Sequence, residues 1–171
     1  HLAASASTLA ETKPAFSILC YPVITAEKGK GHQGSFNALL GGSRNAESDT
    51  WYSLQNRVTA QTPPTLLLLS DDDKVVPPVN GILYYNALKE HGVKASMHIY
   101  PTGGHGWGIR DRFKYKEQWQ QATLDWLKEL NDDRNTASVL LRQPGLPGCV
   151  DVGIRPATSR KSAGRELAEA V

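Results

Sequence analysis

The sequence predicts an α/β protein in which helices cover both faces of a parallel sheet. Three short apolar runs of strand length alternate with longer segments whose apolar residues recur at helical spacing. The run over 65–70 contains four consecutive leucines and no polar alternation, which is typical of a parallel strand buried on both faces. The expected order is helix, strand, long insertion, strand, helix, strand, helix.

The three expected strands are short, and prolines mark their ends. They cover residues 15–21, 65–70 and 95–100. Pro22 follows the first strand and Pro101 the third, and proline cannot donate to a strand ladder. Each run is therefore expected to stop where the sequence changes character.

Two amphipathic helices are expected after the second and third strands. The first begins at Pro77 and Pro78, because proline is tolerated in the first turn, and stops at His91 before Gly92. Its expected inward residues are Val79, Ile82, Leu83, Ala87 and Leu88. The second covers 114–130 and has apolar residues every three or four positions. These residues are Tyr115, Trp119, Ala122, Trp126 and Leu130.

Two segments differ from this pattern. Residues 24–62 are rich in Gly, Ser, Asn, Gln and Lys, with short helices expected at 35–40 and 48–56. Such long insertions are usually functional or mobile, so this one is expected near a substrate site. Residues 131–171 contain no Phe, Trp or Tyr and are expected to form a loose, atypical tail beyond a folded domain over 1–130.

Composition excludes several functional classes. Nineteen Lys and Arg against seventeen Asp and Glu give a net charge of +2, too balanced for a nucleic-acid binder that relies on phosphate neutralisation. The longest apolar run, 66–69, is too short to span a membrane. Cys20 and Cys149 form neither a disulfide framework nor a metal-ligand spacing. No nucleic-acid or membrane partner is expected, and the compartment is not indicated.

Two loops carry the chemically informative residues, and each follows an expected strand. Three consecutive aspartates lie in 70–77, and His105 lies among four glycines in 101–108. The carboxyl ends of neighbouring parallel strands meet at one edge of a sheet, where ligands and catalytic groups gather. A carboxylate that accepts from one imidazole nitrogen fixes the tautomer and leaves the other nitrogen free as a base. The two loops therefore predict an acid–base pair.

These loops resemble those of the α/β-hydrolase superfamily. Residues 73–77, Asp-Lys-Val-Val-Pro, match its Asp-x-x-Val-Pro element, and residues 103–107, Gly-Gly-His-Gly-Trp, match its histidine loop. Segments 16–25 and 32–41 are similar to the bacterial acetyl-xylan-esterase-like branch. The similarity extends in order from His1 to about residue 130. It implies the C-terminal portion of an α/β-hydrolase fold, with its last three parallel strands and flanking helices.

The resemblance implies a carboxylesterase and assigns roles to residues. Asp73 would be the triad acid, with Asp72 as the fallback, and His105 the general base. Trp107 would line the leaving-group side of the site or pack beneath the loop. The implied substrate is a small ester, such as an acetylated sugar or xylan oligomer, and no metal or organic cofactor is required.

The nucleophile of this family is a serine in a Gly-x-Ser-x-Gly-Gly elbow, expected about four residues before His1. Ser43 and Ser70 lack the strand–turn–helix context of an elbow and are not expected to replace it. We therefore expect the chain alone to be inactive. The strand over 15–21 would then lack an upstream partner, and its open apolar edge predicts self-association.

Three other interpretations remain open at this point. The chain could be a non-catalytic α/β module for binding or scaffolding, or a related serine peptidase. The aspartates could instead bind Mg²⁺ or Zn²⁺ together with His105, although no second ligand lies in that loop. His32, His91 and His98 are interpreted as structural.

Overall fold

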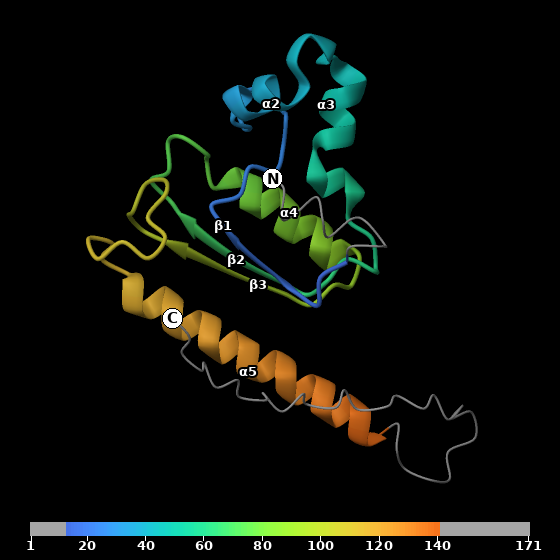
Figure 1. The fold of residues 1–171 in the computed structure, drawn as a ribbon, viewed down its shortest axis with the longest axis vertical. Helices are drawn as coiled ribbons and strands as arrows, with labels where there is room; N and C mark the ends of the chain where they lie inside the picture. The colour runs from blue at the N-terminus through green and yellow to red at the C-terminus, as the bar shows by residue number, and fades with distance from the viewer. Residues whose placement is uncertain (1–12, 141–171) are drawn as a thin grey trace, which may run out of the picture. The chain divides into compact units, whose positions relative to one another are not determined.

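A computed structural model of the chain describes residues 13–140. Its centre is a three-stranded sheet of β1 (Ser17–Cys20), β2 (Thr65–Ser70) and β3 (Ala95–Tyr100), in the order β1-β2-β3 (Figure 1). All neighbours are parallel. The predicted α/β class and parallel sheet are confirmed.

The second and third strands have the predicted bounds, but β1 is shorter than expected. Its ladder ends at Cys20 because Tyr21 leaves the extended conformation and has a φ of 38°. The Tyr21 N–H still donates to the Leu68 carbonyl at 2.8 Å. The strand therefore finishes in a sharp bend, which sequence periodicity does not reveal.

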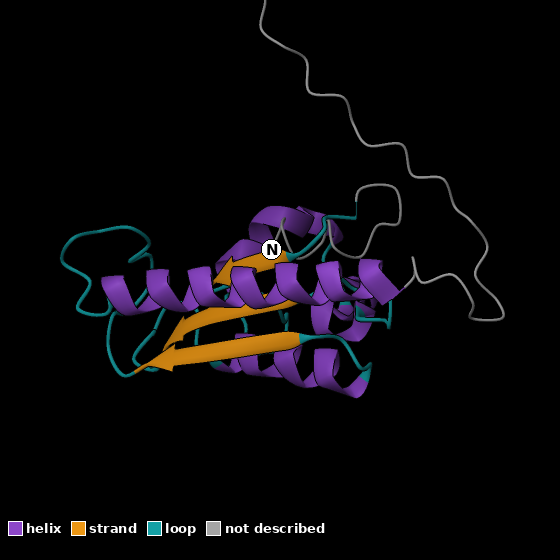
Figure 2. Ribbon diagram, turned by 90° about the horizontal axis from the view of Figure 1, so that it is seen from below, coloured by secondary structure: helices purple, strands orange, loops and turns teal. Residues whose placement is uncertain are grey.

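Helix α4 (Val79–Glu90) covers one face of the sheet, and helix α5 (Lys116–Leu140) covers the opposite face with its residues up to Leu130. Leu67 belongs to the cluster that includes Tyr84 of α4, whereas Leu66 and Leu68 pack with Trp126 of α5. In Figure 2, α5 lies in front of the strands and α4 lies behind them. All six residues of β2 are buried, as predicted for a strand covered on both sides.

The buried face of α4 differs from the expected one. Its buried residues are Asn80, Gly81, Tyr84, Ala87 and Leu88. Only the last two were predicted, and Val79, Ile82 and Leu83 are half-buried. The helix sets its glycine against the sheet: a β-carbon on Gly81 would lie 2.6 Å from Leu69 Cδ1. The predicted stop is confirmed, since Gly92 follows the helix with a φ of 69°.

Helix α5 begins two residues later than predicted and continues ten residues beyond Leu130. The expected loose segment is therefore wrong for 131–140, which contain no Gly or Pro to end a helix. The rest of that expectation, over 141–171, lies outside the described residues. The chain divides into two compact units between Asp132 and Asp133.

The insertion contains α2 (Gln33–Leu40), η2 (Gly41–Ser43), α3 (Ala46–Tyr52) and η3 (Leu54–Arg57). Both predicted helical stretches are present, although the second divides at Ser53. The insertion lies on the α4 side of the sheet (Figure 1), where Ile24, Leu54 and Val58 join the cluster of α4.

Arg44 holds the two helices of the insertion together. Its guanidinium makes a bidentate ion pair with Asp49 of α3, at 2.8 and 3.1 Å. It also donates to Gln33 Oε1 at 2.6 Å and to Asn37 Oδ1 at 2.5 Å, both on α2. One side chain therefore fixes the arrangement of a region that has a small apolar core.

No helix within residues 13–140 is long and apolar enough to cross a bilayer.

Candidate active site

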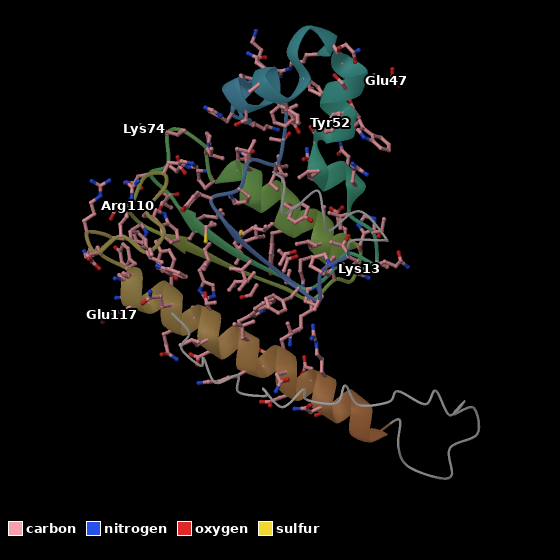
Figure 3. All side chains as sticks on the ribbon, in the orientation of Figure 1. Lys13, Glu47, Tyr52, Lys74, Arg110 and Glu117 are labelled. Carbon is pink, nitrogen blue, oxygen red and sulfur yellow. The ribbon has the colours of Figure 1, made fainter. Side chains whose placement is uncertain are left out.

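Two loops meet at the carboxyl edge of the sheet. Ser70 at the end of β2 is in register with Tyr100 at the end of β3, and the Asp71 N–H donates to the Tyr100 carbonyl at 2.8 Å. In Figure 3, Lys74 and Arg110 mark these loops at one end of the sheet, with Lys13 at the other end. The carboxyl ends of β2 and β3 therefore meet at one edge of the sheet, as predicted for the two loops that carry the acid and the histidine.

Asp73 and His105 are hydrogen-bonded to each other. The distance from His105 Nδ1 to Asp73 Oδ2 is 2.7 Å. The side chain of Asp73 is 1% exposed, whereas that of His105 is 31% exposed. The acid is therefore shielded from water, while the imidazole still reaches the surface.

The backbone orients the Asp73 carboxylate. Its Oδ1 atom accepts from the N–H groups of Val75 and Val76, both at 2.9 Å, so Oδ2 is left for His105. The second and third residues after Asp73 in the Asp-x-x-Val-Pro element thus bind one oxygen of the acid. Such hydrogen bonds fix the position of the carboxylate.

The three consecutive aspartates have different surroundings. Asp73 is buried against His105, Asp72 Oδ1 accepts from the Gly104 N–H at 2.8 Å, and Asp71 is exposed. Asp72 therefore ties the two loops together through the backbone. The structure brings Asp73, and not the fallback Asp72, into contact with the imidazole.

The histidine loop needs glycine for two separate reasons. A β-carbon on Gly103 would lie 2.5 Å from Phe113 Cε2 and 2.6 Å from Ser70 Oγ, so no larger residue fits. Gly104 has a φ of 60°, in the left-handed region that glycine adopts most readily. Both features allow the loop to fold closely over the end of β2.

Trp107 lies beneath the loop and is 3% exposed. Its ring stacks on Phe113 at 4.2 Å and meets Tyr21 and Tyr100 edge-on. This position favours the packing interpretation. Trp107 also borders a small cavity beside His105, so substrate contact stays a prediction.

Tyr21 is a site residue that the analysis of the sequence did not single out. Its ring centroid lies 4.7 Å from that of His105, with an angle of 65° between the planes. Burial raises the pKa of its phenol, and the Gly108 N–H, which donates to Tyr21 Oη, partly opposes that shift. The signal available in the sequence was the Tyr-Pro pair directly after a strand.

Among the described residues, the side chains of the replacement serines and of the other histidines make no hydrogen bond to Asp73 or His105. Within residues 13–140, the imidazole of His105 has Asp73 as its sole hydrogen-bond partner. The Ser70 hydroxyl is buried with no partner among the described residues, and Ser43 ends η2. His32 caps α2, and His91 Nδ1 lies 2.9 Å from the Ala87 carbonyl oxygen.

The described residues also bear on the metal interpretation. In the part of the chain that the structure describes, no three His, Cys, Asp or Glu side chains converge as metal ligands. Both oxygens of Asp73 already have partners: Oδ1 accepts from two backbone N–H groups, and Oδ2 is hydrogen-bonded to the imidazole of His105. The hydrogen bonds of Asp73 therefore serve to orient His105 and do not form part of a set of metal ligands.

The sheet, its flanking helices and the acid–histidine pair define an α/β-hydrolase fold. The chain superposes with a TM-score of 0.66 on the acetyl ester-xyloside bifunctional hydrolase of Caldicellulosiruptor lactoaceticus, at 37% identity, covering 70% of this chain and 44% of that one. A carboxylesterase of Lactobacillus plantarum gives a TM-score of 0.59 at 25% identity, covering 76% of this chain and 54% of that one.

Residues 35–133 match the prolyl oligopeptidase family, and the chain belongs to that family. It is also 40% identical over 136 residues to the acetylxylan esterase of Xylanibacter ruminicola. That match covers 76% of this chain and 28% of the esterase, so the chain spans well under half the length of this relative. The resemblance to α/β-hydrolases and to acetylxylan esterases is confirmed.

Proposed function

We propose that this chain supplies the acid and the general base for serine-dependent hydrolysis of carboxylic esters. The observation that carries the proposal is the buried Asp73 carboxylate, 2.7 Å from Nδ1 of a partly exposed His105. A carboxylate in this position holds the proton on Nδ1 and leaves Nε2 unprotonated. Nε2 is then the atom that accepts a proton from a nucleophile.

The reaction proceeds through an acyl-enzyme. The serine oxygen attacks the ester carbonyl carbon while its proton passes to His105 Nε2, and Asp73 stabilises the imidazolium that forms. The imidazolium then gives this proton to the departing alcohol as the carbon–oxygen bond breaks. Water repeats the sequence on the acyl-enzyme, so the base is regenerated and the acid is released.

An acetylated xylan or sugar is the proposed substrate. Support comes from the relatives, since one is named an acetylxylan esterase and another an acetyl ester-xyloside hydrolase. The insertion over 24–62 would shape the pocket for that substrate, because loops on a rigid sheet commonly set specificity. All acid–base work in this scheme is done by side chains, so no cofactor is required.

The chain alone is not expected to hydrolyse esters. The printed sequence contains no Gly-x-Ser-x-Gly segment, so no elbow serine is available to His105. The purified chain should neither react with a fluorophosphonate probe nor accelerate nitrophenyl acetate hydrolysis. A rate that disappears on His105→Ala would contradict this expectation.

A chimera tests the proposed function directly. The matching segment of this chain would replace its counterpart in the acetylxylan esterase of Xylanibacter ruminicola, which carries the rest of the enzyme. We expect the chimera to deacetylate xylan, and His105→Ala to lower kcat by at least about 10⁴-fold.

The matched control is His91→Ala, which changes an exposed histidine at the end of α4 and should keep the parent rate. A folded chimera in which His105→Ala is as active as the parent would refute the role of His105. A folded chimera that has no activity would favour the non-catalytic interpretation of this segment.

A serine peptidase is the second candidate, because the family that matches the chain is the prolyl oligopeptidase family. The same acid and base would serve both reactions, so the substrate decides between them. Faster turnover of prolyl peptide amides than of acetyl esters by the chimera would favour the peptidase.

A further inference from the structure

The backbone of Tyr21 adopts a conformation that its side chain disfavours. Its φ of 38° is the only positive value at a non-glycine residue within 13–140. A β-carbon makes the left-handed region unfavourable, and glycine or asparagine adopts it more readily. A large aromatic residue at such a bend indicates that the side chain, rather than the turn, is what this position requires.

The side chain of Tyr21 contacts the histidine loop at three places. Its ring lies edge-to-face with His105 at 4.7 Å and with Trp107 at 5.1 Å. Its hydroxyl oxygen accepts from the Gly108 N–H. Tyr21 therefore holds both the imidazole and the backbone that follows it.

The hydrogen bond to Asp73 leaves one motion of His105 unrestrained. A single bond at Nδ1 fixes the distance between the two groups, but the ring can still pivot about that bond. The imidazole is 31% exposed, so packing on its outer side is incomplete. The ring of Tyr21 is an aromatic neighbour that can limit this pivot.

We propose that Tyr21 is a positioning residue that holds the His105 imidazole in the orientation where Nδ1 faces Asp73 and Nε2 faces the nucleophile. This inference rests on the proposed function of His105 as the base. The carboxyl end of β1 thus contributes to the site together with the ends of β2 and β3. The bend after Cys20 places the tyrosine ring beside the imidazole.

The test measures the His105 Nδ1 proton in the 171-residue chain by NMR, which needs no catalytic activity. Tyr21→Leu removes the aromatic ring, and Tyr21→Asn removes it while suiting the left-handed backbone, so at least one variant should fold. Loss of one aromatic pair corresponds to an exchange of this proton with water that is about 2- to 10-fold faster. Tyr21→Phe keeps the ring and should retain the slow exchange of His105, while the Gly108 amide exchanges faster.

Tyr115→Leu is the matched control, because Tyr115 stacks on Tyr100 in the same aromatic cluster and has no ring contact with His105 or Tyr21. Its Nδ1 exchange should equal that of the unaltered chain. Unchanged exchange in Tyr21→Leu and Tyr21→Asn would overturn the inference, as would equally fast exchange in Tyr115→Leu.

The two proposals fail in different ways. Absence of a protected Nδ1 proton in the unaltered chain would refute the Asp73–His105 pair, and the role of Tyr21 with it. A protected proton that ignores every change at Tyr21 would refute the role of Tyr21 alone.

Discussion

The two oxygens of Asp73 have different partners. Oδ1 binds the backbone N–H groups of Val75 and Val76, and Oδ2 binds His105. The sequence predicted this pairing because the Asp-x-x-Val-Pro register selects one of three adjacent aspartates. It could not predict the separate role of Asp72, which depends on where the Gly104 N–H points in the folded loop.

Asp73→Asn should reverse the tautomer of His105. The amide oxygen can still accept from Val75 and Val76, so the amide NH₂ group then faces the imidazole. Nδ1 must therefore become the acceptor and the proton must move to Nε2, which removes the base. The ¹⁵N shifts of the imidazole report this change directly.

Asp71→Asn is the control, since Asp71 is exposed and adjacent in sequence. It should leave the tautomer unchanged. Retention of the Nδ1–H tautomer in Asp73→Asn would show that the acid does not set the protonation of His105.

Tyr84 makes stability depend on pH in the alkaline range. It is fully buried in α4, its hydroxyl has no partner among the described residues, and burial raises its pKa to about 12. The folded chain therefore holds this proton more tightly than the unfolded chain. Its contribution to stability is complete below pH 10 and is lost as the pH rises toward 12, by about 2–3 kcal/mol in all.

Tyr84→Phe should change the free energy of unfolding at pH 7 by less than about 1 kcal/mol, because the removed hydroxyl has no described partner. Between pH 10 and 12 the variant should lose less stability than the unaltered chain. Urea unfolding across this range measures both slopes, with Tyr85→Phe on the same helix as control. Identical slopes for Tyr84→Phe and the unaltered chain would contradict the assignment.

At the scale of elements, strands were easier to predict than helix faces. The run of four leucines predicted β2 unambiguously, because a strand that is buried on both faces carries apolar side chains at successive positions. The inner face of α4 was predicted from apolar residues alone, but the structure buries Asn80 and Gly81 there. A buried amide is recognisable only when its hydrogen-bond partners, distant in sequence, are known.

Asn80 connects α4 to the start of the insertion. Its Oδ1 accepts from the N–H groups of Ile24 and Thr25, both at 3.1 Å, and its Nδ2 donates to the carbonyls of Lys30 and Pro77. Asn80→Ala leaves two buried N–H groups unpaired, so we expect a loss of about 2–4 kcal/mol of stability. Thermal or urea unfolding measures this loss.

Asn86→Ala is the matched control, since Asn86 is exposed on the same helix and its replacement should cost less than about 0.5 kcal/mol. Equal stability of the two variants would show that the amide network does not anchor the insertion.

At the scale of the whole molecule, β1 and β3 are the two edge strands of the described sheet. Among the described residues, β1 pairs only with β2, so one side of β1 and one side of β3 carry no neighbouring strand. We expect the chain to self-associate through the edge of β1, because an edge that has no neighbouring strand among the described residues and carries apolar side chains favours pairing with another copy. Light scattering over a concentration series checks this, and a monodisperse monomer at all concentrations would contradict it.

The order of elements and the meeting of the two loops could be predicted because parallel strands bring their carboxyl ends to one edge. The role of Tyr21 could not, since it depends on a backbone bend that no periodicity encodes. The length of α5 was also missed, because composition changes after residue 130 without a helix-breaking residue until Pro144.

A double-mutant cycle on the chimera tests the Asp73–His105 unit most directly. The kcat for acetyl ester hydrolysis would be measured for Asp73→Asn, His105→Ala and the double variant. Residues that act as one unit give non-additive losses, so the double variant should be no slower than His105→Ala alone. Losses that multiply in the double variant would show that the two residues act independently and would contradict the account.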